Sequence, residues 1–176
     1  NLGRLIDRDD IGYTTLQFDL EGKGFTEKYL DTKFSGSVQN ITYNRYNYKN
    51  IIAEGKFKKP IFKGKVNVND PNLFLDFDGI VDLSKREKNY NFHAKVDYAN
   101  LNRLNLIKDS VSVFKGDVKI NVSGNNLDKM NGNIVVSNSS YQNSKDLYFF
   151  DNFTASSIEA NGEHVITLNS SKELNG

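Results

Sequence analysis

The sequence predicts an all-β chain, a curved antiparallel meander of about ten strands that forms a groove with an apolar interior. Three observations predict it. Apolar and polar side chains alternate through most of the 176 residues, as in strands with one dry and one wet face. The breaks between the alternating stretches are short and rich in turn residues. Glycine recurs in the middle of the predicted strands, on their apolar side.

The alternating stretches can be followed along the chain. The longest series runs from Leu73 to Leu83, and such a strand would extend over roughly 30 Å. Two late stretches, 148–155 and 165–168, follow the pattern less clearly. The apolar positions of the other predicted strands are Leu16, Phe18 and Leu20; Phe34, Gly36 and Val38; Ile51, Ala53, Gly55 and Phe57; Phe62, Gly64, Val66 and Val68; Leu73, Leu75, Phe77, Gly79, Val81 and Leu83; Tyr90, Phe92, Ala94, Val96 and Tyr98; Phe114, Gly116, Val118, Ile120 and Val122; and Ile134 and Val136.

The breaks favour a meander. Pro60 and Pro71 both fall in breaks, as a sheet requires, because proline cannot donate a ladder hydrogen bond. Short connections place strands that follow one another in sequence side by side. Two breaks, 100–106 and 126–132, have apolar residues three apart and predict one or two short helical turns, which as isolated helices would be marginal. We expect them to cover an end of the apolar face.

Mid-strand glycines predict curvature. Several glycines on one face of successive strands let a sheet curl toward that face, whereas a single glycine more often marks a bend or a bulge. We favour the curl, which would turn the sheet into a trough. The glycines concerned are Gly36, Gly55, Gly64, Gly79 and Gly116.

The composition argues against several classes of function. The formal charge is +1, with both signs interspersed, so we expect no nucleic-acid partner. Cysteine is absent, which removes disulfides, thiolate metal sites and cysteine nucleophiles. No apolar run approaches the roughly 20 residues that cross a bilayer as a helix.

Catalytic and metal-binding motifs are missing too. The two histidines, His93 and His164, stand far apart, and His93 alternates toward the polar face, so they do not suggest a zinc site. The aspartates between Asp70 and Gly79 are only weakly similar to a calcium loop, because no glutamate follows at the required position. We therefore expect no enzyme activity, no metal and no cofactor.

A sheet with one apolar face must cover that face. It can fold over as a sandwich, close as a barrel, or bind something apolar. The alternation does not separate these options. An open groove would expose an apolar patch larger than ordinary monomers tolerate, and would imply a hydrophobic ligand or partner.

The middle of the chain has a repeated texture, in which alternating strands with a glycine are followed by short polar breaks. The pieces that carry it are Phe34-Ser35-Gly36-Ser37-Val38, 46–55, Phe62-Lys63-Gly64, Asp70-Pro71-Asn72-Leu73, 78–83, 92–97 and the leucines of 101–106, with Phe114-Lys115-Gly116-Asp117 and 127–132 in the same style. This texture resembles the β-rich part of TamB-type translocation and assembly module proteins, within the wider AsmA-like group.

The resemblance has consequences for fold, place and partners. It implies an elongated, taco-like β-sheet with an apolar interior, in a protein anchored in the inner membrane of Gram-negative bacteria and crossing the periplasm to the outer membrane. It implies phospholipid transport to the outer membrane, or protein assembly there with an outer-membrane barrel partner. The chain begins at Asn1, without an anchor helix, and we expect residues 1–176 to be a single β-groove segment from the middle of a longer protein.

The leading hypothesis is therefore a periplasmic lipid conduit whose partners are phospholipid acyl chains. The apolar face would form a dry floor for these chains, and lipid headgroups would stay in water. The residues expected to line this groove are Phe57, Phe62, Val66, Val68, Leu73, Leu75, Phe77, Val81, Phe92, Val96, Phe114, Val118, Ile120 and Val122.

Two other functions remain open from the sequence. A closed β-sandwich could bind a protein by adding a strand at its edge. A sandwich could also bind carbohydrate through exposed aromatic side chains on the wet face. The candidates for such a platform are Tyr43, Tyr46, Tyr48 and Tyr141.

Overall fold

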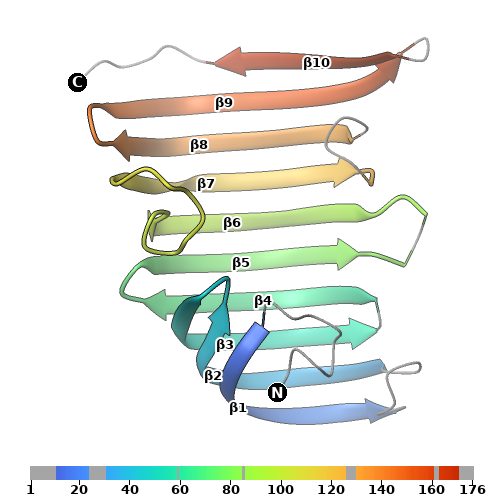
Figure 1. Cartoon of the computed structure of the whole chain (residues 1–176). Helices are drawn as coiled ribbons and strands as arrows, with labels where there is room; N and C mark the ends of the chain where they lie inside the picture. The colour runs from blue at the N-terminus through green and yellow to red at the C-terminus, as the bar shows by residue number, and fades with distance from the viewer. Residues whose placement is uncertain are drawn as a thin grey trace.

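The structure is one open antiparallel β-sheet whose ten strands lie side by side in chain order (Figure 1). The computed structural model describes residues 11–23, 31–58, 60–84, 86–125, 130–160 and 163–170. The strands are β1 (Ile11–Lys23), β2 (Asp31–Tyr43), β3 (Tyr46–Lys58), β4 (Ile61–Asp70), β5 (Leu73–Asp82), β6 (Asn89–Asn100), β7 (Ser112–Ser123), β8 (Asn131–Asn143), β9 (Leu147–Ala160) and β10 (Glu163–Ser170).

This architecture confirms the all-β meander. The sheet is not closed, because β1 and β10 are its two edges and pair with each other nowhere in the described residues. A closed sandwich is therefore wrong for this part of the chain, which holds one sheet and no second layer of strands. No helix occurs in the described stretches, so none there is long and apolar enough to cross a membrane.

The two predicted helical turns have different outcomes. In 100–106, the N–H of Leu104 donates to the carbonyl oxygen of Asn100 at 3.0 Å, and the Asn100 side chain accepts from the N–H of Arg103. This is a single capped turn, too short to continue as a helix. In 126–132, residues 126–129 lie outside the described part, and Asn131 and Gly132 already belong to β8.

Register and alternation together build the two faces. One row of directly opposed residues runs Val66, Phe77, Ala94 and Val118 across β4 to β7. Side chains one position along each strand point to the opposite face. The neighbouring row on that polar face is Lys65, Asp78, His93 and Lys119.

The alternation breaks at a bulge in β6. Leu75 lies opposite Val96, but Phe74 lies opposite Tyr98, so β6 holds one extra residue there. A bulge of this kind shifts every later side chain to the other face. Ala99 consequently lies opposite Leu73 on the apolar face and is 4% exposed. The sequence prediction that Tyr98 continues the apolar series is wrong for this reason.

Three glycines lie directly opposite one another on the apolar side. Gly55, Gly64 and Gly79 are consecutive members of one row across β3, β4 and β5. A Cβ on Gly64 would lie 2.2 Å from the carbonyl oxygen of Glu54 and 2.9 Å from the Cα of Gly55. Strands β3 and β4 therefore approach too closely at this pair for a side chain on Gly64, and the curl that the glycines predict stays a prediction.

Replacing Gly64 by alanine is expected to lower stability by about 1–3 kcal/mol, because the added methyl must displace main-chain atoms of β3. At a position with room for the methyl group and no backbone strain, the same change would stabilise the protein by about 0.4–1 kcal/mol. The sign of the change in unfolding free energy therefore tells whether the position is crowded. Urea unfolding measures the difference. Ser35→Ala on the polar face is the control. If Gly64→Ala unfolded at the same or a higher urea concentration than the wild type, the close approach of β3 and β4 would be contradicted.

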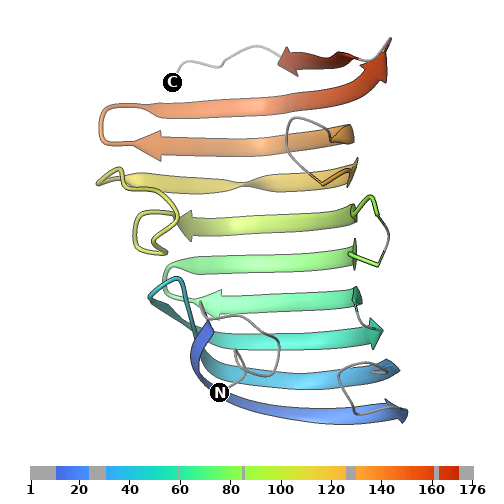
Figure 2. The same ribbon diagram turned by 45° about the vertical axis from the view of Figure 1, so that its right-hand side comes forward.

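A bend in β3 carries the β2–β3 hairpin out of the sheet. The ladder between β3 and β4 ends at the pair Ile51 and Val68. The next residue of β3, Asn50, has φ of 51°, a left-handed conformation that asparagine tolerates better than most residues. Its side chain donates to the carbonyl oxygen of Asn69 at 3.2 Å. The hairpin tip consequently rises in front of β3 and β4 (Figures 1 and 2).

Candidate functional site: an open apolar face

The predicted groove residues share one face. Cross-strand pairing places them in successive rows on that face, and the bulge in β6 keeps Phe114 there, opposite Ala99. The rows are Phe57, Phe62, Val81 and Val122; Phe92 and Ile120; Val66, Phe77 and Val118; Val68, Leu75 and Val96; and Leu73 with Phe114.

Most of this face is only half covered. Few apolar side chains of the described residues are buried, and nearly all of the predicted groove residues are partly exposed. The face also continues to both edges of the sheet. Leu20 in β1 is 56% exposed and Leu168 in β10 is 63% exposed, and both belong to the row that contains Phe92 and Ile120. The structure therefore presents a broad apolar surface in a single layer.

A chain of phenylalanine rings crosses the face from β1 to β6. We call Phe18, Phe34, Phe62, Phe77 and Phe92 the aromatic ladder. Their successive ring centroids are 5.9, 5.9, 6.1 and 5.0 Å apart, within the range of favourable ring contacts. The ladder explains part of the glycine pattern.

The rings pass over the glycines. Phe34 in β2 lies opposite Gly55 in β3, and its ring makes contact with Phe62 in β4. Phe92 in β6 lies opposite Gly79 in β5. Because a glycine has no side chain, rings on flanking strands can meet across it. The sequence showed the glycines and the phenylalanines, but the pairing register was needed to show that they complement each other.

One end of the apolar face is covered. The tip of the β2–β3 hairpin, residues 43–46, and the loop after β6, residues 101–107, meet there, and we call these two segments the clasp. The Leu104 side chain in the loop is 1% exposed. Its burial agrees with the prediction that this break covers an end of the apolar face, and Figure 1 shows the loop lying in front of β6 and β7.

A buried carboxylate anchors the hairpin. Asp70, the last residue of β4, is fully buried and belongs to the apolar side of that strand. It accepts hydrogen bonds from the Tyr46 hydroxyl at 2.5 Å, the Lys49 N–H at 2.9 Å and the Asn72 N–H at 2.8 Å. Tyr46 in turn accepts from the Asn72 side chain at 2.9 Å. Burial raises the pKa of the Tyr46 phenol, and the hydrogen bond to Asp70 raises it further.

Sequence reasoning missed this anchor. The sequence pattern groups Asp70 with the later aspartates as a weak calcium motif, but Asp76 and Asp78 face the polar side of β5 while Asp70 faces the apolar side. The three carboxylates therefore do not converge. The position of Asp70 in the alternation could have revealed the anchor. Asp70 follows Val66 and Val68 at every second residue, on the apolar face, and an aspartate buried there needs several hydrogen-bond donors.

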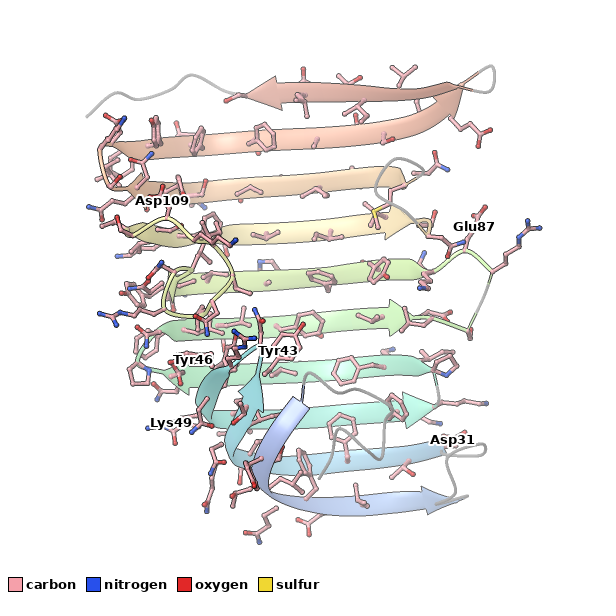
Figure 3. The ribbon with its side chains drawn as sticks, viewed as in Figure 1. Asp31, Tyr43, Tyr46, Lys49, Glu87 and Asp109 are labelled. Atoms are coloured by element: carbon pink, nitrogen blue, oxygen red, sulfur yellow. The ribbon has the colours of Figure 1, made fainter. Side chains whose placement is uncertain are left out.

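The tyrosines do not form a platform on the wet face. Tyr46 and Tyr48 pack edge to face against each other in the hairpin, with ring centroids 4.7 Å apart. The Tyr141 hydroxyl is 3.1 Å from the buried Ser112 hydroxyl. Tyr43 lies in the clasp, in front of the sheet (Figure 3). These positions favour packing roles over a sugar-binding surface.

The polar face carries interspersed charges. His93 is half exposed there, as its alternation predicts, and its Nε2 lies 3.4 Å from Asp117. A shallow depression of about 680 Å³ lies on this face over β1 to β5. Its charged lining balances, so it offers no clear site for an anion or a cation. The charged residues around it are Lys33, Lys56, Lys63, Lys65, Asp19, Glu21, Glu54 and Asp78.

Comparison with known proteins adds no family. No protein-family model, no curated protein and no solved structure matches the chain. The ten-stranded open meander and its apolar face are what the structure shows, and the similarity to TamB-type proteins stays a prediction.

Proposed function

We propose that this chain is a groove segment that binds phospholipid acyl chains along its apolar face. The observation that carries the proposal is the continuity of that face, which runs from Leu20 in β1 to Leu168 in β10 with most of its side chains partly exposed. Exposing so large an apolar surface to water is unfavourable in free energy. A flexible hydrocarbon chain fits it because it needs no specific polar partner.

The binding would be driven by the apolar area that the acyl chain and the sheet remove from water. Each methylene group that leaves water contributes about 0.8 kcal/mol, so a chain lying across several strands gains affinity without a shaped pocket. The backbone groups between neighbouring strands already bond to each other, and the floor offers acyl chains mainly apolar side chains. A lipid headgroup would remain in water, beside the charged side chains of the strand ends.

The wider setting belongs to the same proposal. Such a groove suits a TamB-like or AsmA-like protein that is anchored in the inner membrane and conducts phospholipid through the periplasm to the outer membrane. Assembly of outer-membrane proteins with a barrel partner is the related role. Support for this setting comes from the repeated strand texture and from the single-layer sheet with one dry face.

Photo-crosslinking tests the proposal directly. A photoreactive amino acid at Leu75 or Ile120 on the apolar face should capture lipid when the protein is expressed in Gram-negative cells or mixed with phospholipid vesicles. The adjacent positions Asp76 and Lys119 face the polar side and should capture none. Mass spectrometry of extracted lipid identifies the adduct. Equal capture on both faces, or capture on neither, would overturn the proposal.

A second function has one observation in its favour. β10 pairs regularly with β9 along its whole length, without a bulge, and its sequence contains no proline or lysine that would discourage a further strand. Ile166 at this edge is 62% exposed. Strand addition to β10 by a protein partner would extend the sheet and its apolar face.

A further inference from the structure

The clasp joins two parts of the chain that are distant in sequence. Asn44, at the hairpin tip, donates from its side-chain amide to the carbonyl oxygen of Asn105 at 2.8 Å. Asn105 donates in the same way to the carbonyl oxygen of Asn44 at 3.1 Å. The two residues are 61 positions apart, and the bonds connect β2 and β3 to the loop between β6 and β7. Figures 1 and 2 show the hairpin leaning in front of the sheet toward this loop.

The two ends of the hairpin differ in how firmly they are held. Buried Asp70 holds the hairpin from its base up to the side chain of Tyr46, because it accepts from the Lys49 N–H and from the Tyr46 hydroxyl. At the turn, the bonds between Asn44 and Asn105 are exposed to solvent, so water competes for both amides. The Asn44–Arg45 turn is therefore held to the loop less firmly than the rest of the hairpin is held to the sheet, because each exposed neutral hydrogen bond contributes only modest net stability.

The backbone of the hairpin and of the loop contains left-handed residues. Asn44 and Arg45 at the tip have φ of 47° and 64°, Asn50 at the base has 51°, and Asn105 in the loop has 59°. Residues other than glycine adopt this left-handed region infrequently. At the tip these are the angles of a two-residue hairpin turn between the paired residues Tyr43 and Tyr46, which takes positive φ at both central residues.

Buried residues lie at the end of the apolar face where the clasp is. Leu104 within it is 1% exposed, and Val68 and Ala99, in the rows nearest this end, are 6% and 4% exposed. Farther along the same strands, residues such as Phe62 and Phe92 are only partly covered. Lifting the tip would add this buried end to the open floor.

We propose that the clasp is a gate on the acyl-chain groove, latched by the reciprocal Asn44–Asn105 hydrogen bonds and opening between the Asn44–Arg45 turn and the loop 101–107. This inference rests on the proposed function, since it regulates the same face. In the closed state the floor ends at the clasp. In the open state an acyl chain reaches the strip around Val68 and Ala99.

The chain has no cysteine, which makes the gate easy to lock. The double variant Asn44→Cys/Asn105→Cys, joined by a short thiol-to-thiol crosslinker, holds the latch closed, and the same variant without crosslinker is its control. Asn44→Ala/Asn105→Ala releases the latch. Asn91→Ala/Asn121→Ala removes two asparagines that lie opposite each other on the polar face and serves as the matched control.

Two measurements separate the gate from the groove. Hydrogen–deuterium exchange over residues 41–48 reports opening without any ligand, and the fluorescent fatty acid cis-parinaric acid reports uptake by the apolar face. Releasing the latch should increase exchange about tenfold or more, which corresponds to the loss of two exposed hydrogen bonds. Uptake should become faster by a similar factor. Locking should slow both below the wild-type rates, and the polar-face control should change neither.

The possible failures are distinct. If exchange responds to the latch but uptake of the fatty acid is identical in locked and released protein, the clasp is a structural tether and the gate is overturned. If exchange is the same in all forms, the asparagine bonds are no latch, which also overturns it. If no form takes up the probe while exchange responds, the proposed acyl-chain function fails, and the gate fails with it.

Discussion

Replacing Leu75 by glutamate is expected to reduce acyl-chain binding at least tenfold. Leu75 lies in β5 between Val68 and Val96, on the apolar face. A carboxylate there would have to lose its hydration whenever a hydrocarbon chain covered it, and burying an unpaired charge is strongly unfavourable. A tenfold loss corresponds to about 1.4 kcal/mol, which is smaller than the contribution of two buried methylene groups.

The fold should tolerate this change better than binding does. Leu75 is partly exposed in the free protein, so the carboxylate keeps access to water, and we expect a cost of about 1–2 kcal/mol in stability. Titration with cis-parinaric acid measures binding, and urea unfolding measures stability on the same samples. Ile120→Glu, in another row of the same face, should behave alike.

The adjacent residue provides the matched control. Asp76 faces the polar side, where its carboxylate accepts a hydrogen bond from the Asn67 side chain at 2.7 Å. Asp76→Asn changes charge at the neighbouring position without touching the floor, and should leave binding unchanged. If the folded Leu75→Glu variant bound cis-parinaric acid with wild-type affinity, the apolar face would not be the binding surface.

Replacing Asp70 by alanine is expected to destabilise the protein by about 2–5 kcal/mol. The change deletes a fully buried acceptor and leaves the proton of the Tyr46 hydroxyl and two main-chain N–H groups without an acceptor. Each buried donor left unsatisfied costs about 1–3 kcal/mol, partly recovered where water enters. Asp70→Asn should have an intermediate effect, because the amide keeps one acceptor oxygen.

Denaturant unfolding checks this prediction, with Asp76→Ala as the comparison. Asp76 is exposed and its removal should change stability by no more than about 0.5 kcal/mol. Exchange of the hairpin amides should also rise in Asp70→Ala, because the base of the hairpin loses its anchor. Similar unfolding free energies for the Asp70 and Asp76 variants would show that the anchor contributes nothing.

The sequence by itself determined the class of sheet and the composition of its faces. Alternation with a period of two is a local property, and it assigned the apolar positions of β4, β5 and β7 correctly because those strands are regular through most of their length. It also predicted that the 100–106 break covers an end of the apolar face. One sheet with a dry face could still have been half of a sandwich, which alternation does not distinguish.

Only the tertiary structure decided what covers the apolar face and where. The bulge in β6 moved Tyr98 off the face, and no periodicity reports an extra residue whose effect depends on the partner strand. The left-handed Asn50 brought the hairpin over the sheet, buried Asp70 and carried Asn44 to Asn105. Contacts across 61 residues depend on the summed bends of the strands between them, which is why local sequence patterns do not encode them.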